Sequence, residues 1–128
     1  MSKTIFGYLI TQSVLFDIEA GRLINLRDLS SEERVPCVSM HRTMILLLEF
    51  ILERRDEEAI AIDEILYHVW DRNYLQSYSQ RLWKVMKDLK GKLKSVGVKV
   101  DFIVKKNKHS YRVNGSLVTP IYYIPNGC

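Results

Sequence analysis

Cysteine, proline and glycine are scarce in this sequence of 128 residues, which has 2 cysteines, 3 prolines and 6 glycines. Two cysteines cannot form the disulfide framework of a small secreted domain, and one of them, Cys128, is the last residue. We therefore expect a cytoplasmic protein in which Cys37 is a small buried apolar residue rather than a reactive thiol. Hydrophobic residues make up 47% of the chain, which is typical of one globular domain rather than of a disordered chain.

Long apolar runs are absent as well. The longest run, from Met44 to Leu52, has nine residues and contains Glu49, whereas a membrane-spanning helix needs about 20. The apolar stretch near the N-terminus is interrupted by Thr11, Gln12 and Ser13 and has no small-residue cleavage site, so it is a poor signal peptide. The sequence therefore predicts a protein that does not cross a membrane.

Acidic residues are scarce in the second half only. Residues 1–64 hold 7 basic and 12 acidic residues, a net charge of −5, and residues 65–128 hold 12 basic and 3 acidic residues, a net charge of +9. The two halves sum to the net charge of +4 for the whole chain. Such asymmetry indicates a surface for a polyanion, most often nucleic acid, although a lysine face that only keeps the protein soluble has the same composition.

The hydrophobic patterns predict an α+β fold that begins with strands and continues with helices. Short segments rich in Ile, Leu, Phe and Tyr, separated by turn residues, are typical of strands; they are residues 5–10, 13–18, 22–26 and 35–38. A first helix is expected from an N-cap at Ser39 to about Arg55, and a second from a cap at Asp63. The second helix has one apolar stripe, made of Ile62, Ile65, Leu66, Val69 and Trp70.

The rest of the chain predicts a loop, a third helix and a hairpin. The loop is residues 71–78, the helix 79–95, and the hairpin has strands 98–104 and 110–113 around a basic turn at 105–109. The last residues, 114–128, have two interpretations, an added edge strand or an interaction segment. Two helices joined by a loop and followed by a basic hairpin are the layout of a winged helix-turn-helix.

The third helix has two different faces. At about 100° per residue, its inner face carries Leu82, Met86, Leu89 and Leu93. Its outer face carries lysines at intervals of about one turn, where a solvated face usually mixes signs. The repulsion between these lysines becomes favourable if phosphates neutralise them. The outer face and its flanks comprise Gln80, Arg81, Lys84, Lys87, Asp88, Lys90, Gly91 and Lys94.

Two residues of this helix have alternative interpretations. Gly91 costs about 1 kcal/mol relative to alanine in a helix interior; it either permits close approach of a phosphodiester backbone or is a weak position near the end of the helix. Trp83 lies on the border between the two faces. A tryptophan there usually packs half-buried against a sheet or hairpin, and the alternative is contact with a partner protein or a sugar-phosphate.

The hairpin turn supplies a second basic cluster. It contains Lys105, Lys106, Lys108 and His109 around Asn107. A basic helix followed by a basic hairpin is the order of a recognition helix and a wing, which together grip a groove and its flanking backbone.

The ordered set of segments resembles the OmpR/ToxR-type (ToxR/CadC-like, OmpR/PhoB-type) winged helix-turn-helix family of bacterial DNA-binding domains. The resemblance extends over residues 5–113 and rests on FDIEAGRLINL (16–26), LLLEFIL (46–52), IDEILYHVW (62–70), LWKVMKDLKGKL (82–93) and SYRV (110–113). It implies an N-terminal four-stranded antiparallel sheet, a three-helix core and a C-terminal β-hairpin wing within residues 1–113.

The resemblance also implies a function. In this family the third helix enters the major groove of double-stranded DNA, here residues 79–95, and the wing, here residues 104–110, lies on the flanking backbone. Base and phosphate contacts are implied for Arg81, Lys84, Asp88 and Lys90, and contact of the loop 71–78 with RNA polymerase is known in the response-regulator branch. The sequence departs from the family at Asp88 and Lys90, where arginine is common, and at Ser110, where the wing usually has glycine. An acid at position 88 accepts a hydrogen bond from cytosine but repels phosphate.

The lysine face, the hairpin and the resemblance together give the candidate residues. The candidate DNA-binding residues are Gln80, Arg81, Lys84, Lys87, Asp88, Lys90, Gly91, Lys94, Lys105, Lys106 and Lys108. The candidate contacts with polymerase or another partner are Arg72, Asn73, Tyr74 and Trp83.

No motif in the sequence indicates an enzyme, a metal site or a cofactor. His41, His68 and His109 fall in different elements without a second ligand at metal spacing, and there is no glycine-rich phosphate loop. Our leading hypothesis is a sequence-specific transcriptional regulator that stands alone, because these residues leave no room for a receiver domain. The alternative is a winged-helix adaptor that controls another regulator without binding DNA, through the acidic half, Trp83 or the tail. Either protein can form a homodimer.

Overall fold

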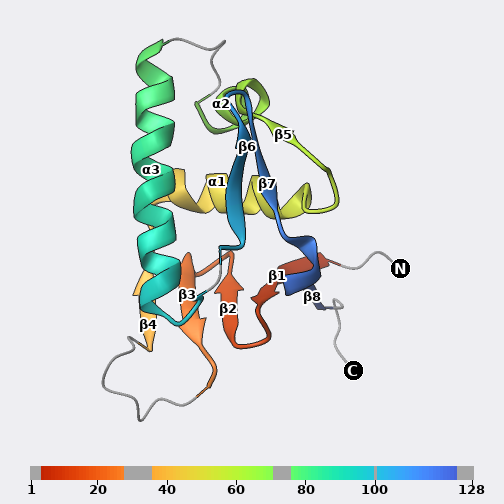
Figure 1. Cartoon of the computed structure of the whole chain (residues 1–128). Helices are drawn as coiled ribbons and strands as arrows, with labels where there is room; N and C mark the ends of the chain where they lie inside the picture. The colour runs from red at the N-terminus through yellow and green to blue at the C-terminus, as the bar shows by residue number, and fades with distance from the viewer. Residues whose placement is uncertain (1–3, 28–35, 71–75, 100, 124–128) are drawn as a thin grey trace.

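The computed structural model describes residues 4–27, 36–70, 76–99 and 101–123. These residues form a five-stranded antiparallel sheet, three α-helices and a second, three-stranded antiparallel sheet (Figure 1). The five-stranded sheet lies at one end of the molecule, and α1 (Arg42–Glu53) crosses over it (Figure 1). The hairpin of β6 (Ile103–Asn107) and β7 (Ser110–Val113) runs alongside α3 (Gln76–Ser95). Helix α2 (Ile62–Trp70) packs on α1 at the other end.

The larger sheet contains one strand more than expected. Its strands are β1 (Thr4–Ile10), β2 (Val14–Asp17), β3 (Arg22–Asn25), β4 (Cys37–Ser39) and β8 (Val118–Tyr123), in the order β4-β3-β2-β1-β8. The four expected strands are all present, and the tail adds a fifth at the edge, which was one of the two interpretations of residues 114–128. The strand β8 comes from the tail and pairs with β1 between Ile10↔Val118 and Thr4↔Tyr123, which gives the backbone groups on that side of β1 hydrogen-bond partners.

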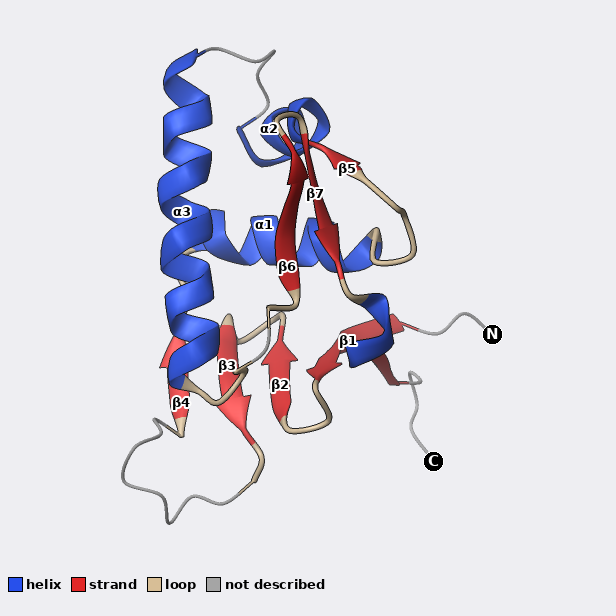
Figure 2. Ribbon diagram, viewed as in Figure 1, coloured by secondary structure: helices blue, strands red, loops and turns tan. Residues whose placement is uncertain are grey.

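One face of this sheet packs against α1. Side chains alternate along the strands, so Tyr8, Ile10, Val14, Phe16 and Leu23 are all buried in the core. The helix α1 covers this face (Figure 2). Cys37 is half-buried on β4 rather than fully buried as expected.

The first helix begins later than the sequence indicated. Helix α1 spans Arg42–Glu53, and its N-cap is His41, whose Nδ1 accepts a hydrogen bond from the backbone N–H of Met44 at 3.4 Å. Ser39 is not the cap, because it belongs to β4 and is paired with Arg22 of β3. The backbone N–H of Met40 also donates to the carbonyl of Gly21, so the chain is held beside β3 up to Met40 and the helix begins only after it.

A short strand precedes the second helix. Ile60–Ala61 forms β5, which pairs with β7, and α2 follows directly as Ile62–Trp70. Asp63 is therefore not a cap but a residue of the first helical turn, where a negative charge is favourable because of the helix dipole. The short ladder between β5 and β7 attaches the start of α2 to the hairpin.

The third helix is longer than expected. Helix α3 spans Gln76–Ser95 and so includes the last residues of the loop expected at 71–78. Its first turn contacts α2, because the rings of Tyr78 and Trp70 lie 5.8 Å apart. The helix ends where Gly97 takes a φ of +112°, which glycine adopts without strain. The backbone N–H of Val98 then bonds to the carbonyl of Leu93, as in a Schellman motif.

The hairpin is formed by β6 (Ile103–Asn107) and β7 (Ser110–Val113). The strand expected at 98–104 thus begins later, and the basic turn expected at 105–109 shrinks to Lys108 and His109. The side chain of Asn107 explains the tight turn, since its Oδ1 accepts the backbone N–H of His109 at 2.8 Å. A short 3₁₀ turn (Gly115–Leu117) leads from the hairpin to β8. No helix among the described residues is long and apolar enough to cross a membrane.

Candidate nucleic-acid interface

The inner face of α3 anchors it to the rest of the molecule. Leu82, Met86, Leu89 and Leu93 are all buried, as their spacing predicted. These residues fix the rotation of the helix about its axis, so the opposite face must point to solvent. Every candidate residue on that face is exposed: Gln80, Arg81, Lys84, Lys87, Asp88, Lys90, Gly91 and Lys94.

The exposed face of α3 and the hairpin together line two adjoining hollows. The first has a volume of about 460 Å³ and is bordered by Leu82 and Trp83 of α3, Lys105, Lys108 and His109 of the hairpin, and the start of α2. The second, of about 320 Å³, is bordered by Trp83, Lys87 and Lys90 of α3 and by Lys105. Tyr111 of β7 lines both. The two basic clusters of the sequence therefore meet along one surface.

The cations on this surface have no acidic partner within the described residues. Among all the described residues, the ion pairs are those of Arg54 with Glu57 and Glu64 and that of Lys106 with Glu58. Asp88 is exposed on α3 among these lysines and Asp63 borders the first hollow, but neither lies in such a pair. Unpaired lysines along a groove leave a strong positive potential, which attracts phosphate groups.

Two lysines of the same segments are engaged elsewhere. Lys92 donates from its Nζ to the carbonyl oxygen of Ser39 at 2.8 Å and so faces the larger sheet. Lys106 donates to the carbonyl oxygen of Glu58 at 3.2 Å, and its Nζ lies 4.0 Å from the Glu58 carboxylate. The candidate Lys106 therefore points away from the surface that Lys105 and Lys108 share with α3.

Aromatic rings accompany the cations at the N-terminal half of α3. The guanidinium of Arg81 lies 5.0 Å from the ring centroid of Tyr78, and the Nζ of Lys87 lies 5.2 Å from that of Trp83. Trp83 is 59% exposed, so the expectation that it packs half-buried against the sheet or hairpin is wrong. Both cations lie over ring faces, which the negative quadrupole of the rings favours.

The C-terminal end of α3 has a smaller hollow of its own. Its volume is about 160 Å³, and its lining includes Lys90 and Lys94 of α3 together with Lys99 and Asp101. Lys99 was not among the candidates of the sequence analysis. The signal for it was its place two residues after the helix-ending Gly97, where the turn returns a basic residue toward the helix.

Gly91 has no packing reason to be glycine. A Cβ built at this position would meet nothing within 4 Å, and the residue is exposed. The two interpretations of Gly91 therefore both remain, but no neighbour within the molecule requires it.

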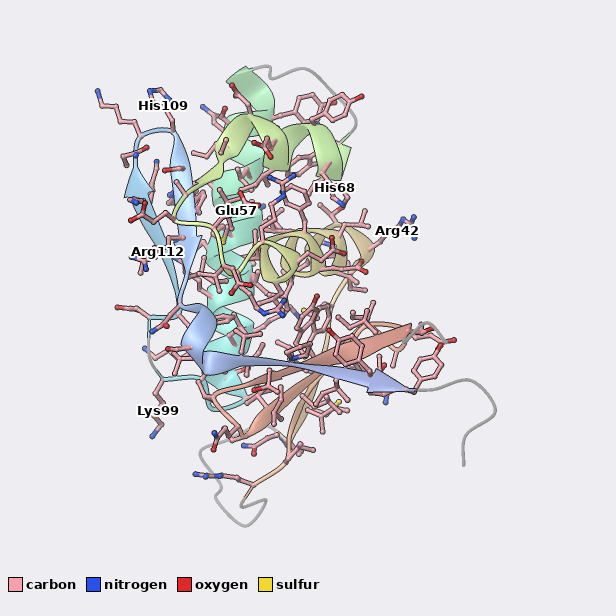
Figure 3. The ribbon with its side chains drawn as sticks, turned by 90° about the vertical axis from the view of Figure 1, so that its right-hand side faces the viewer. Arg42, Glu57, His68, Lys99, His109 and Arg112 are labelled. Atoms are coloured by element: carbon pink, nitrogen blue, oxygen red, sulfur yellow. The ribbon has the colours of Figure 1, made fainter. Side chains whose placement is uncertain are left out.

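His109 lies at the tip of the hairpin, and Arg112 lies farther along it (Figure 3). The side chain of His109 borders the hollow that Lys105 and Lys108 line, and so does Asp63 of α2. One acid therefore stands at the α2 end of the basic surface. Tyr111 is buried, and burial raises the pKa of its phenol above the usual value of 10.0, so the ring remains neutral beneath the lysines.

Other candidates lie outside this surface. Arg72, Asn73 and Tyr74 fall in residues 71–75, which are outside the described residues. His68 borders a different hollow, with Phe50 and Tyr67, and its ring stacks on that of Phe50 with the centroids 4.4 Å apart. Within the described residues, no group of three or more His, Cys, Asp or Glu side chains is arranged to hold a metal ion.

Comparison with known proteins gives a likeness in fold only. No family model and no curated protein matches the sequence. Among solved structures, the DNA-binding domain of E. coli CadC superposes with a TM-score of 0.66 at 15% sequence identity, and the match covers 95% of this chain and 100% of that domain. The chain thus has a fold similar to that of the CadC DNA-binding domain, with three helices and antiparallel sheets consistent with a winged helix.

Proposed function

We propose that this protein is a sequence-specific double-stranded DNA-binding regulator of transcription. The observation that carries the proposal is the continuous surface on which Lys87 and Lys90 of α3 and Lys105 of the hairpin line one hollow, with no acid paired to them among the described residues. The fold likeness to a DNA-binding domain supports the same conclusion.

The proposed mode of binding follows from the dimensions of α3. An α-helix with its side chains is about 10–12 Å across, and the major groove of B-DNA is about 12 Å wide. Helix α3 stands out along one side of the molecule (Figure 1). It enters the groove with its lysine face, where Asp88 reaches a base edge and the lysines contact phosphates. The hairpin tip with Lys108 then lies on the backbone beside the groove.

Phosphate contacts give the proposal a quantitative form. The exposed cations Arg81, Lys84, Lys87, Lys90, Lys105 and Lys108 supply about six contacts, so the affinity should fall by about three orders of magnitude between about 50 and 200 mM salt. A protein whose lysines serve only solubility has no such linear dependence at nanomolar duplex concentrations.

The experiment is fluorescence anisotropy with labelled genomic duplexes at several salt concentrations. The variant Lys84→Ala/Lys87→Ala should bind more weakly and lose about 2 from the slope of log K against log salt. Lys92→Ala is the matched control, because its ammonium is bonded to Ser39 on the other side of the helix. The proposal is wrong if no duplex binds at low salt, or if the double variant binds as the unaltered protein does.

A further inference from the structure

Trp83 is the one large apolar side chain that α3 leaves largely exposed within its described residues 78–95. Its exposed fraction is 59%, whereas Leu82, Met86, Leu89 and Leu93 of the same helix are at most 3% exposed. It borders the two hollows between α3 and the hairpin. On the other side it borders a third hollow with Gln80, Arg81 and Lys84. The indole therefore stands as a ridge in the centre of the proposed DNA surface.

The fold itself gives little reason for a tryptophan at this position. Tryptophan is a poorer helix former than lysine or glutamine, and leaving an indole in water forgoes the gain from burying a large apolar surface. Its ring contact with a charged group is with the Nζ of Lys87 at 5.2 Å, and a cation–π contact at an exposed site is weak. The side chain is suited instead to a surface that covers it on binding.

The residues around Trp83 indicate what kind of binding partner covers it. Lys84, Lys87 and Lys105 surround the indole, and an apolar protein surface covering it would have to strip water from these ammonium groups without compensating charge. A nucleic acid supplies phosphates for the lysines and apolar base edges for the ring. Charge complementarity therefore selects DNA as the occupant.

In a duplex the faces of the bases are stacked and closed to a side chain. The apolar group that the major groove does expose is the C5 methyl of thymine. We propose that Trp83 determines sequence specificity by packing its indole on a thymine methyl, while Lys84 and Lys87 hold the phosphates on either side. This inference rests on the proposed function, since it assigns one base contact within that DNA complex.

The test uses the duplex that the protein itself prefers, obtained by binding-site selection. Each thymine of this duplex is replaced in turn by deoxyuridine, which removes only the methyl group. We expect one position, or two adjacent ones, to lose about fourfold in affinity, as for one buried methyl. In the variant Trp83→Ala the same replacements should have no effect, so that the two changes are not additive.

Two further readouts keep the outcomes distinct. In the variant Trp70→Phe, Trp83 is the remaining tryptophan, and its emission should shift to shorter wavelength when duplex is added. The variant Lys84→Ala serves as the matched control, because it should weaken binding at every site and keep the dependence on thymine.

The inference is overturned if Trp83→Ala binds with unchanged affinity, or if both proteins lose equally on removal of the methyl. A Trp83-dependent preference for a single-stranded oligonucleotide would instead assign the indole to stacking on an unpaired base, and so would also overturn it. Absence of binding to any duplex at low salt overturns the proposed function as well, which separates the two failures.

Discussion

The ammonium of Lys92 lies 2.8 Å from the carbonyl oxygen of Ser39 and so joins the last turns of α3 to β4. Lys90, two residues earlier, borders the second of the two hollows shared with the hairpin and the smaller hollow at the C-terminal end of α3. These two lysines are separated by one residue on the same helix but have different roles. Lys92 stabilises the fold, and Lys90 lies on the proposed DNA surface.

This pair gives a direct test of which lysines meet phosphate. Lys90→Ala should reduce the slope of log K against log salt by about 1, because one phosphate contact is lost. Lys92→Ala should leave the slope unchanged and lower the free energy of unfolding by about 0.5–1.5 kcal/mol, the net value of one hydrogen bond. Anisotropy titrations and urea unfolding of both variants measure the two effects. Equal slopes for the two variants would contradict the assignment.

The hairpin offers a second matched pair. Lys105 lines the hollows shared with α3, whereas Lys106 is directed to Glu58. We expect Lys105→Ala to weaken DNA binding and to reduce the salt slope by about 1, and Lys106→Ala to have a clearly smaller effect. The same titrations check this expectation. A larger loss for Lys106→Ala would mean that the opposite face of the hairpin lies on the DNA.

Local pattern was enough to predict the parts of the fold that depend on neighbours in sequence. The four buried residues from Leu82 to Leu93 recur with the helical period, so the helix and both of its faces followed from the sequence. The second hairpin strand, Ser110–Val113, followed in the same way. The lysines on the exposed face were therefore found by sequence alone.

Long-range pairing was not predictable in this way. The strand β5 has two residues and exists because Ile60 and Ala61 meet Tyr111 and Ser110, about fifty positions away. An edge strand in the tail was one of two interpretations, but the pairing of β8 with β1, at the opposite end of the chain, was not predicted. The exposure of Trp83 and the hydrogen bonds of Lys92 and Lys106 likewise depend on which distant segments lie beside them. No local period contains that information.

Gly91→Ala should stabilise the protein. Alanine is favoured over glycine in a helix interior by about 1 kcal/mol, and the added methyl would meet no atom within 4 Å. We expect the free energy of unfolding in urea to rise by about that amount. Unchanged or lower stability would show that the backbone at position 91 is not held as an ordinary helix.

The same variant decides between the two interpretations of Gly91. If the glycine permits close approach of a phosphodiester backbone, Gly91→Ala should bind DNA more weakly in spite of its greater stability. If the glycine is only a weak position near the end of the helix, the affinity should be unchanged. Anisotropy at one salt concentration is sufficient, with Lys92→Ala as the reference for a change elsewhere on the helix.

Glu49 predicts a pH dependence of stability. Burial raises the pKa of its carboxyl above the usual 4.5, repulsion from Glu53 adds to this, and His68 opposes it. The folded state therefore binds this proton more tightly than the unfolded state does. The resulting penalty is fully present above the raised pKa and is lost as the pH falls through it.

Glu49→Gln should remove this penalty. We expect a higher Tm than for the unaltered protein at pH 7 and a difference that shrinks as the pH approaches 4. Thermal unfolding of the two proteins across this range measures it. The control is Glu53→Gln, which removes the repulsion but leaves Glu49 half-buried, and should give a smaller gain. A difference that grows toward low pH would contradict the direction of the shift.

The last prediction concerns the end of the domain. A chain that stops at Val113 keeps the three α-helices and the hairpin but loses the 3₁₀ turn and β8. It therefore loses the pairing of β8 with β1 between Thr4 and Ile10 and the buried side chain of Val118. The backbone N–H of Thr11, which donates to the carbonyl of Leu117 at 2.7 Å, also loses its partner.

We expect this truncation to lower the free energy of unfolding by at least about 2 kcal/mol, since burial of one valine alone is worth about 1.5 kcal/mol or more. It should also expose an unpaired strand edge that favours self-association. Urea unfolding and size-exclusion chromatography measure the two effects, and a chain that stops at Tyr123, which keeps β8, is the matched control. If the chain that stops at Val113 were as stable as this control, β8 would contribute nothing to the fold and the domain would end at the hairpin. The pairing of β8 along β1 argues against this, because it makes β8 a strand of the sheet that packs against α1.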